Sequence, residues 1–223
     1  MDALAPAWFV TGTDTEIGKT LAACALLHAL RAKFPRAVGT KPVAAGHPPG
    51  GVNDDVVRLR AASTVQVPAA LDNPYHLAEA VSPHLAAQAA GVRIDLAHIA
   101  HCVADLRRSA DAVVVEGVGG FLVPLSSIED GGDLAHELRL PVVLVVGIKL
   151  GCLSHALLTQ EAISARGLPF AGWIANRIDA DMLRAEDNIA TLRARLRAPC
   201  LGAIPHMAPP DSARAAVFLQ LPT

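Results

Sequence analysis

The sequence lacks a strong charge of either sign. It has 19 Lys and Arg residues against 21 Asp and Glu residues, a formal net charge of −2. Proteins that bind nucleic-acid phosphates or anionic membranes do so through clustered positive charge. The charge balance therefore argues against nucleic acid and against a membrane as the main partner, and it favours a small molecule.

Long apolar runs and a targeting signal are also missing. The longest apolar run, residues 140–148, ends at Lys149 and is far shorter than the ~20 residues that cross a bilayer. The first ten residues carry Asp2 and lack the basic segment and following apolar stretch of a secretory signal. We predict no transmembrane helix and a cytoplasmic location.

Cysteine and lysine are both scarce. No CxxC pair occurs, and the four cysteines lie far apart in mostly apolar surroundings, which is typical of buried reduced thiols: Cys24, Cys102, Cys152 and Cys200. Arginine supplies nearly all the positive charge, so the chain has only four lysines: Lys19, Lys33, Lys41 and Lys149. We interpret this scarcity as an indication that the few lysines have a chemical role.

Apolar residues, in contrast, are plentiful. At 223 residues and 52% hydrophobic composition, the chain can bury a sizeable core and is not expected to be disordered. Short β-rich runs predict strands at 7–11, 37–40, 112–116, 142–147, 170–175 and 200–203. Longer amphipathic stretches predict helices at 19–33, 95–108, 152–166 and 181–197, with shorter ones near 54–62, 82–90 and 133–138.

This alternation of strand and helix predicts an α/β fold with a mainly parallel sheet. The runs 113–115 and 142–146 are apolar on both faces, as expected of central strands covered by helices on each side. We predict one three-layer α/β/α domain over 1–223. The Pro/Gly-rich segment 47–53 is interpreted as an active-site loop, and region 66–83 gives no clear pattern.

A glycine-rich turn, GTDTEIGKT at 12–20, follows the first predicted strand and opens a helix. In a P-loop, backbone N–H groups cradle phosphates, Lys19 reaches the β- and γ-phosphates, and the Thr20 hydroxyl binds Mg²⁺. Five residues, one more than the strict pattern allows, separate Gly12 from Gly18. The context still predicts a nucleotide site in a P-loop NTPase-like fold.

Further polar residues follow the other predicted strands, where ligands of parallel sheets bind. Glu116 ends one strand before a Gly-rich segment and is a candidate metal ligand, with Asp54 or Asp55 as a second carboxylate. Lys41 ends another strand and would bring a second cation to the same edge. Each has a simpler interpretation: a solvated strand end for Glu116, a helix N-cap for the Asp pair, and a surface lysine for Lys41.

Two strand ends carry weaker signals. Lys149 and the following helix start could bind a carboxylate, and Asn176 could bind a purine edge, although an Asn there is more often a turn residue. A competing metal site would use His98, His101 and Cys102, which share one helical face. We favour ordinary packing for these three residues, because no fourth ligand with suitable spacing lies near.

Taken in order, several segments resemble the dethiobiotin synthetase family over nearly the whole chain. The resemblance rests on FVTGTDTEIGKT at 9–20, KPVA at 41–44, NPY at 73–75, SPH at 82–84, VEG at 115–117, KLGC at 149–152 and GWIAN at 172–176. The lengthened P-loop is itself a feature of that family.

The resemblance implies an ATP- and Mg²⁺-dependent cyclo-ligase of biotin biosynthesis. In that reaction, 7,8-diaminononanoate takes up CO₂ as a carbamate, ATP phosphorylates the carbamate, and the second amine closes the cyclic urea of dethiobiotin with release of ADP and phosphate. The family's members are homodimers in which the substrate carboxylate reaches the other subunit. The resemblance therefore also implies a homodimer with shared sites.

The same resemblance assigns residues to the site. Lys41 and Lys19 would be catalytic, and Thr20, Asp55 and Glu116 would hold Mg²⁺, which leaves Asp54 as a bystander or helix cap. ATP would contact Thr13, Glu16, Ile17, Gly18, Lys19, Thr20, Asp55, Glu116, Gly117, Val118, Gly119, Asn176, Pro205, His206 and Met207. Substrate would contact Thr13, Lys41, Ala45, Gly119, Leu150, Gly151 and Cys152.

Two positions depart from the better known bacterial members. Ala45 stands where those proteins have a substrate-contacting Ser, and Ser154 stands where they have an Asn near the shared carboxylate site. The chemistry is expected to survive both changes.

Three other functions remain in competition. A regulatory P-loop ATPase of the partition or iron-protein type would typically carry a further lysine early in the P-loop, and 11–13 has none. A cofactor-diamide amidotransferase would need a glutaminase domain, for which the chain is too short. A nucleotide-binding module would bind ATP and turn over no diamine.

Overall fold

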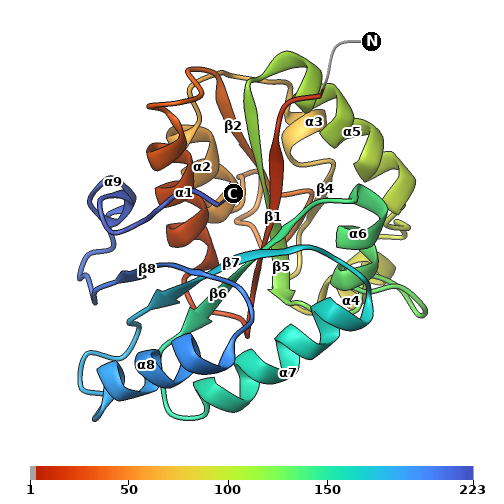
Figure 1. Cartoon of the computed structure of the whole chain (residues 1–223). Coiled ribbons are helices and arrows are strands. Elements are labelled where there is room, and N and C mark those ends of the chain that lie inside the picture. Colours follow the sequence, from red (N-terminus) through yellow and green to blue (C-terminus); the bar gives the residue numbers. More distant parts are fainter. Residues whose placement is uncertain (1–3, 223) are drawn as a thin grey trace.

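A computed structural model of the chain describes residues 4–222. Its main sheet has six parallel strands in the order β2-β5-β1-β6-β7-β8, with helices on both faces (Figure 1). The predicted three-layer α/β fold with a mainly parallel sheet is thereby confirmed. Parallel strands require long crossovers, and the helices between them supply these connections.

The strands are β1 (Ala7–Gly12), β2 (Ala37–Thr40), β3 (Val43–Ala45), β4 (Tyr75–Leu77), β5 (Ala112–Gly120), β6 (Val142–Gly147), β7 (Phe170–Asn176) and β8 (Cys200–Ile204). The helices are α1 (Lys19–Leu30), α2 (Asp54–Ala62), α3 (Ala69–Asp72), α4 (Pro83–Ala89), α5 (Leu96–Ser109), α6 (Gly131–Leu138), α7 (Cys152–Ala165), α8 (Ala185–Arg195) and α9 (Ser212–Ala216).

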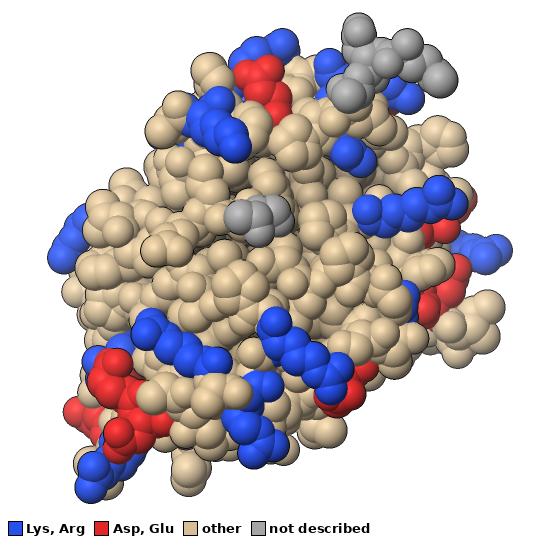
Figure 2. Space-filling model, viewed as in Figure 1, with Lys and Arg blue, Asp and Glu red and all other residues tan. Residues whose placement is uncertain are grey.

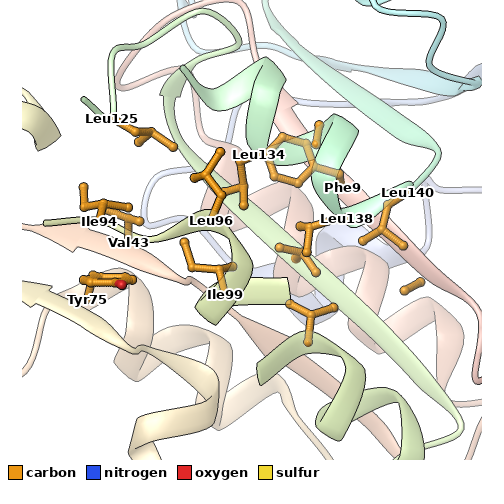
Figure 3. Packing of buried hydrophobic residues seen from close by; sticks show 14 of the residues in the cluster. Phe9, Val43, Tyr75, Ile94, Leu96, Ile99, Leu125, Leu134, Leu138 and Leu140 are labelled. Carbon is orange, nitrogen blue, oxygen red and sulfur yellow. The ribbon is translucent and has the colours of Figure 1, made fainter. Parts of the chain in front are cut away.

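Both faces of the central strands are buried, as their continuous apolar runs predict. Along β5, Val113 and Val115 pack with α5 and α6, and Val114 packs on the other face with α1. Figure 3 shows the first of these cores, in which Phe9 lies beside residues of α5 and α6. On that same face, a third core joins β6 and β7 to α7 and α8. Burial on two faces makes the sheet a rigid support for the loops at its edge.

Three predicted boundaries were wrong by three residues or more. The helix predicted to start at 181 starts at Ala185, because a turn precedes it in which Asp179 accepts a hydrogen bond from the Asp181 N–H and Arg184 is left-handed. The strand predicted to end at Glu116 continues to Gly120, because Gly120 still pairs with Gly12 of β1. The first helix ends at Leu30 instead of 33.

Four short elements were not predicted, namely β3, β4, α3 and α9. Strands β3 and β4 form a separate two-stranded parallel sheet, and β4 and α3 come from the region that gave no clear pattern. Strands of three residues are too short for an alternation of polar and apolar residues to be recognised.

The cysteine prediction holds for three of the four residues. All four thiols are free, and Cys24, Cys102 and Cys152 are buried, whereas Cys200 is only partly buried. Burial raises the pKa of the Cys24 thiol to about 12, which keeps it protonated.

The surface carries charges of both signs. On the face shown in Figure 2, Lys and Arg side chains stand near Asp and Glu towards the margins, and uncharged residues fill the middle. Within residues 4–222, no helix combines the length and the apolar character needed to span a membrane.

Candidate functional site

The site is a cavity of about 710 Å³ at the carboxyl ends of the parallel strands. Ligands of open parallel sheets bind at this edge, because the loops after several strands converge there. Its lining combines the turn after β1, the residue after β2, the start of α2 and the end of β5. It comprises Thr15, Glu16, Gly18, Lys19, Thr20, Leu21, Lys41, Ala45, Asp55, Arg58, Ala80, Val81, Ser82, Pro83, Glu116, Val118, Gly119, Val123, Asn176, Arg177, Ile178, His206, Met207 and Pro210.

The turn between β1 and α1 has the backbone of a phosphate-binding loop. Gly18 caps α1 in a left-handed conformation (φ 80°), and a Cβ there would lie 2.1 Å from the Asn176 amide nitrogen. Only glycine fits that place. The Asn176 amide donates to the Ile17 carbonyl at 2.9 Å, so β7 holds the turn directly. Glu16 also has a positive φ of 58°, a strained conformation of the kind that clusters at ligand sites.

Lys19 lies at the start of α1, only 7% exposed, and its side chain turns back over the loop. Its Nζ donates to the Asp14 carbonyl at 2.8 Å. Burial lowers the pKa of Lys19 to about 8, and the nearby charge of Lys41 adds to this effect, while Glu116, Asp55 and Asp14 oppose it. The ammonium is therefore costly to bury in the free protein and would gain from an anionic ligand.

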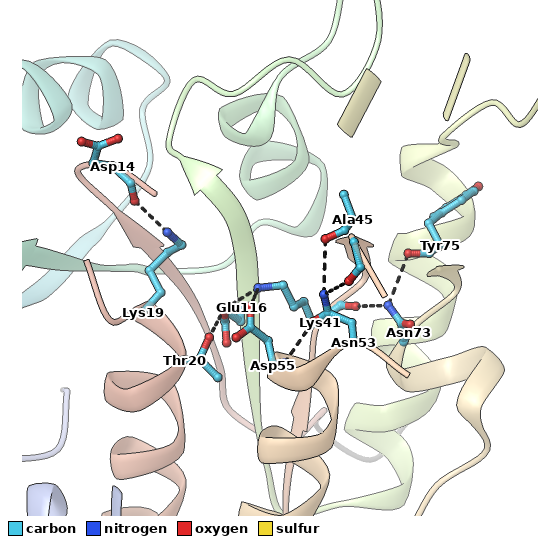
Figure 4. A network of polar contacts seen from close by, with 11 residues as sticks. Asp14, Lys19, Thr20, Lys41, Ala45, Asn53, Asp55, Asn73, Tyr75 and Glu116 are labelled. Carbon is cyan, nitrogen blue, oxygen red and sulfur yellow. Dashed lines mark hydrogen bonds and ion pairs between the residues drawn. The ribbon is translucent and has the colours of Figure 1, made fainter. Parts of the chain in front are cut away.

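Lys41 is held between two carboxylates (Figure 4). Its Nζ is 2.6 Å from Glu116 Oε1 and 2.7 Å from Asp55 Oδ2, and Lys41 is 5% exposed. Burial alone would lower the pKa of Lys41, but the charges of Glu116 and Asp55 outweigh it and raise that pKa. Lys41 is thus a buried cation in the site and not a surface lysine at a strand end.

The residues predicted to hold Mg²⁺ meet at the same point. Thr20 Oγ1 donates to Glu116 Oε1 at 2.8 Å, and Lys41 joins Glu116 to Asp55. Glu116 is 1% exposed, and its Oε2 has no hydrogen-bond partner among the described residues. One hydroxyl and two carboxylates form an oxygen donor set of the kind that Mg²⁺ takes. A buried carboxylate oxygen without a partner fits a cation at this place.

The backbone around Lys41 is itself fixed by a second layer of polar contacts. The Lys41 N–H donates to the Asp72 carbonyl at 2.9 Å, and the Asn73 amide donates to the Lys41 carbonyl at 2.7 Å. The buried Asp72 carboxylate accepts two hydrogen bonds from Arg60, each 2.7 Å. The NPY segment at 73–75 therefore positions Lys41, which is a role the sequence did not predict.

Not every residue predicted for the site lines the cavity. Those that do are Glu16, Gly18, Lys19, Thr20, Lys41, Ala45, Asp55, Glu116, Val118, Gly119, Asn176, His206 and Met207. Those that do not are Thr13, Ile17, Gly117, Pro205, Leu150, Gly151 and Cys152. Ile17 is fully buried, whereas Leu150 is 92% exposed.

Other lining residues were not predicted. Arg58 lies three residues after Asp55 on α2. This spacing places both on one face of the helix and could have indicated that Arg58 also lines the cavity. Arg177 follows Asn176 directly at the end of β7. Ala80, Val81 and Ser82 lie between β4 and α4, and Pro83 is the first residue of α4; the sequence predicted a short helix near 82–90 but assigned none of these residues to the site.

Lys149 and the group of His98, His101 and Cys102 were the weaker candidates for ligand binding, and each makes contacts within the protein. Lys149 Nζ lies 3.1 Å from Asp14 Oδ2, so in this structure it pairs with the P-loop. His98 Nε2 contacts Cys102 Sγ at 3.8 Å, and a ring nitrogen of His101 lies 2.8 Å from the Ala97 carbonyl of its own helix. Across residues 4–222, no three His, Cys, Asp or Glu side chains gather in a way that could hold a metal.

Comparison with known sequences gives a uniform picture. A family model described as an AAA domain matches residues 7–214. The chain is 57% identical to an ATP-dependent dethiobiotin synthetase BioD of Aromatoleum aromaticum, over 97% of each chain. It is also 57% identical to a protein of that name from Ralstonia nicotianae (96% of this chain, 94% of the relative) and 55% identical to one from a Janthinobacterium species (95% and 92%).

Solved structures confirm the fold. The MinC:MinD cell division complex of Aquifex aeolicus contains a chain with a TM-score of 0.58 and 16% identity, which matches over 95% of this chain and 86% of its own length. A ParA family ATPase from Chlorobium tepidum has a TM-score of 0.57, also at 16% identity, over 96% and 89% of the two chains. Likeness at this identity concerns the fold alone.

Proposed function

Because this chain belongs to the dethiobiotin synthetase family, we propose that it converts 7,8-diaminononanoate, CO₂ and ATP into dethiobiotin, ADP and phosphate. It is an enzyme, a ligase that forms the ureido ring in biotin biosynthesis. The observation that carries the mechanism is the position of Lys41, buried between Asp55 and Glu116 and lining one cavity together with the P-loop.

The first step needs little from the protein beyond orientation. An amine nitrogen of the diamine attacks the carbon of CO₂ and loses a proton, which leaves a carbamate. A carbamate oxygen then attacks the γ-phosphorus of ATP, and the bond to the ADP oxygen breaks. Such a transfer depends on alignment and on stabilisation of charge. No protein nucleophile takes part.

The two lysines act on the transferred group from two sides. Lys19 and the N–H groups of the P-loop bind the ATP phosphates. Lys41, whose raised pKa keeps it protonated, stabilises the negative charge on the transferring phosphoryl group and on the carbamate. Finally the second amine attacks the carbamoyl carbon of the mixed anhydride and loses a proton, and the bond from that carbon to the phosphate oxygen breaks, so that phosphate leaves as the ring closes.

Thr20, Asp55 and Glu116 would hold Mg²⁺, which supplies charge neutralisation to the ATP phosphates. Lys41 Nζ lies between Asp55 and Glu116, so these two carboxylates also orient the lysine. The adenine end of ATP would contact Asn176, His206 and Met207, which line the other side of the cavity.

The enzyme acts as a homodimer in this proposal, with residues 1–223 of each subunit as one domain. Leu150, Gly151 and Cys152 do not line the cavity of their own subunit, and Leu150, just before α7, is 92% exposed, while Leu158 within α7 is 65% exposed. These residues would reach the substrate carboxylate bound in the second subunit. Light scattering after size exclusion should give twice the mass of 23.2 kDa, and a monomer that is fully active would contradict this arrangement.

The deciding experiment follows carbon from bicarbonate. The protein is incubated with ATP, Mg²⁺, ¹³C-bicarbonate and 7,8-diaminononanoate, and the products are analysed by mass spectrometry while phosphate release is measured. Labelled dethiobiotin that depends on ATP supports the proposal. Phosphate release without labelled product would contradict it and would favour a regulatory ATPase, and ATP binding without turnover would favour a binding module.

A further inference from the structure

The side chain of Asn53 makes three contacts with backbone groups of two separate segments. Its Oδ1 accepts a hydrogen bond from the Asp55 N–H at 3.0 Å and thereby caps α2. Its Nδ2 donates to the Gly46 carbonyl at 2.6 Å and to the Ala45 carbonyl at 3.3 Å. One planar amide therefore closes the base of the loop between β3 and α2 (Figure 4).

The two segments that Asn53 joins belong to different parts of the site. Asp55 lines the cavity and pairs with Lys41 on the phosphoryl side. Ala45 lines the cavity at the end of β3, on the side that we assign to the diamine. Ala45 has no polar side-chain atom, so the position of this wall is set by its backbone, which pairs with Leu77 of β4 and accepts a hydrogen bond from Asn53.

The remaining contacts of the loop do not join its two ends. The Gly46 N–H donates to the Leu77 carbonyl at 3.0 Å and the His47 N–H to the Ala78 carbonyl at 3.3 Å, which ties the start of the loop to β4 and the residue after it. At the loop's far end, the Gly51 N–H donates to the Pro48 carbonyl at 2.9 Å, which is a contact within the loop itself. Among the described residues, the side-chain contacts that connect the loop's two ends are those of the Asn53 amide.

We propose that Asn53 is a positioning residue, which fixes the diamine wall at Ala45 and Gly46 relative to the Asp55 carboxylate that orients Lys41. A simple helix cap would use only Oδ1, since capping requires an acceptor for the first N–H groups of the helix. The two hydrogen bonds donated by Nδ2 serve no capping function. The inference rests on the proposed function for the identity of the substrate, and on geometry for the rest.

Two substitutions separate the cap from the loop contacts. Asn53→Ser keeps an acceptor of the kind that caps helices well and is too short to reach both carbonyls. Asn53→Ala removes the cap and the loop contacts together. As a control, Asp95→Ala removes the N-cap of α5, where Asp95 accepts from the Ala97 N–H at 2.9 Å and does not line the cavity.

If Asn53 positions the diamine wall, both Asn53 variants should raise the KM for the diamine about tenfold, the effect of losing one to two hydrogen bonds. The KM for ATP should stay within about twofold in Asn53→Ser. The midpoint of thermal unfolding should fall in Asn53→Ala and in Asp95→Ala but hardly in Asn53→Ser. The diamine KM of Asp95→Ala should equal that of the unmodified protein.

Several results would overturn the inference. A normal diamine KM in Asn53→Ser with a raised one in Asn53→Ala would make Asn53 a helix cap only. A normal KM in both would remove it from the site. Equal rises in the KM for ATP and for the diamine in Asn53→Ser would indicate general loosening in place of positioning.

A readout without turnover distinguishes this inference from the proposed function. Hydrogen exchange of the peptide covering 46–52, measured by mass spectrometry, should be faster in both Asn53 variants and unchanged in Asp95→Ala. If the unmodified protein makes no labelled dethiobiotin, the proposed function fails while the exchange result still tests the loop contact. If dethiobiotin is made and exchange in Asn53→Ser is unchanged, the positioning role fails by itself.

Discussion

The two lysines of the site are held in opposite ways. Lys19 has one hydrogen bond, to the Asp14 carbonyl, and burial lowers its pKa to about 8. Lys41 lies between two carboxylates that raise its pKa. We therefore propose that Lys19 serves mainly to bind the phosphates of the nucleotide, whereas Lys41, already oriented by its two carboxylates, acts mainly in the chemical step.

The difference extends to the supporting residues. Behind Lys41 lie the buried Asp72, which Arg60 fixes, and the buried Asn73, whose amide donates to the Lys41 carbonyl. Behind the Lys19 side of the site, the Asp14 carboxylate pairs with Lys149 near the surface, where these side chains are 44% and 38% exposed. Preorganised charge acts on a transition state without the cost of reorganisation, so we expect changes on the Lys41 side to have larger effects.

The largest effect should come from Lys41→Gln. Gln keeps much of the side chain's length and removes its charge, so kcat should fall by about 10²- to 10³-fold, the scale found when a preorganised electrostatic group is lost. The Kd for ATP should stay within about threefold, measured by calorimetry. Lys33→Gln, at the exposed end of the turn after α1, is the matched control and should leave kcat unchanged. An unchanged rate in Lys41→Gln would remove Lys41 from the mechanism.

Lys19→Gln should act mainly on nucleotide binding. Losing a charge-assisted contact to phosphate costs about 1.5–3 kcal/mol, which corresponds to a Kd for ATP raised by roughly 10- to 100-fold. The proposed contrast between the two lysines would be contradicted if Lys19→Gln left the Kd for ATP unchanged, or if Lys41→Gln raised that Kd as much as Lys19→Gln does. Calorimetric titration of both variants with ATP and Mg²⁺ measures the contrast directly.

Arg60→Met tests how firmly the layer of polar residues behind Lys41 is held. The change leaves the Asp72 carboxylate, 3% exposed, without its two hydrogen bonds. Because the Arg60 side chain is 36% exposed, water can replace part of this contact, and we expect a loss of about 2 kcal/mol in the free energy of unfolding. Urea denaturation measures it. Arg108→Met, which breaks an exposed pair with Asp105, should cost less than about 0.5 kcal/mol.

The smallest effect belongs to the pair of Asp14 and Lys149. The hydrogen bond from Lys149 lowers the pKa of Asp14 below its ordinary value of 3.8, so the pair stabilises the folded protein above that pH and its contribution is lost as the pH falls through the lowered pKa. Both side chains are more than one third exposed, which limits the contribution to about 0.5 kcal/mol.

Urea denaturation of the unmodified protein and of Lys149→Met, compared at pH 7 and pH 3, should show this small difference at pH 7 and a smaller one at pH 3, where the pH is already below the ordinary pKa of Asp14. A loss above about 1 kcal/mol at pH 7 would mean that the P-loop side is as firmly supported as the Lys41 side.

Much of the fold could be predicted from the sequence because it depends on local patterns. The apolar runs of β5 and β6 indicated central parallel strands, and the glycines, Lys19 and Thr20 of the P-loop indicated a phosphate site at a helix start. The errors fell where a neighbour in space decides the backbone. Pairing with Gly12 extends β5 to Gly120, and β3 and β4 exist only because they pair with each other.

The sequence by itself determined that several polar residues follow parallel strands, since the end of a strand can be recognised in a run of amino acids. Only the tertiary structure decided how they meet: that Lys41 is buried between Asp55 and Glu116, that Asn176 donates to the P-loop, and that Asn53 joins two segments. Those contacts link residues up to 159 positions apart in the chain. Such partners are set by the packing of strands and helices, a property that no short stretch of sequence contains.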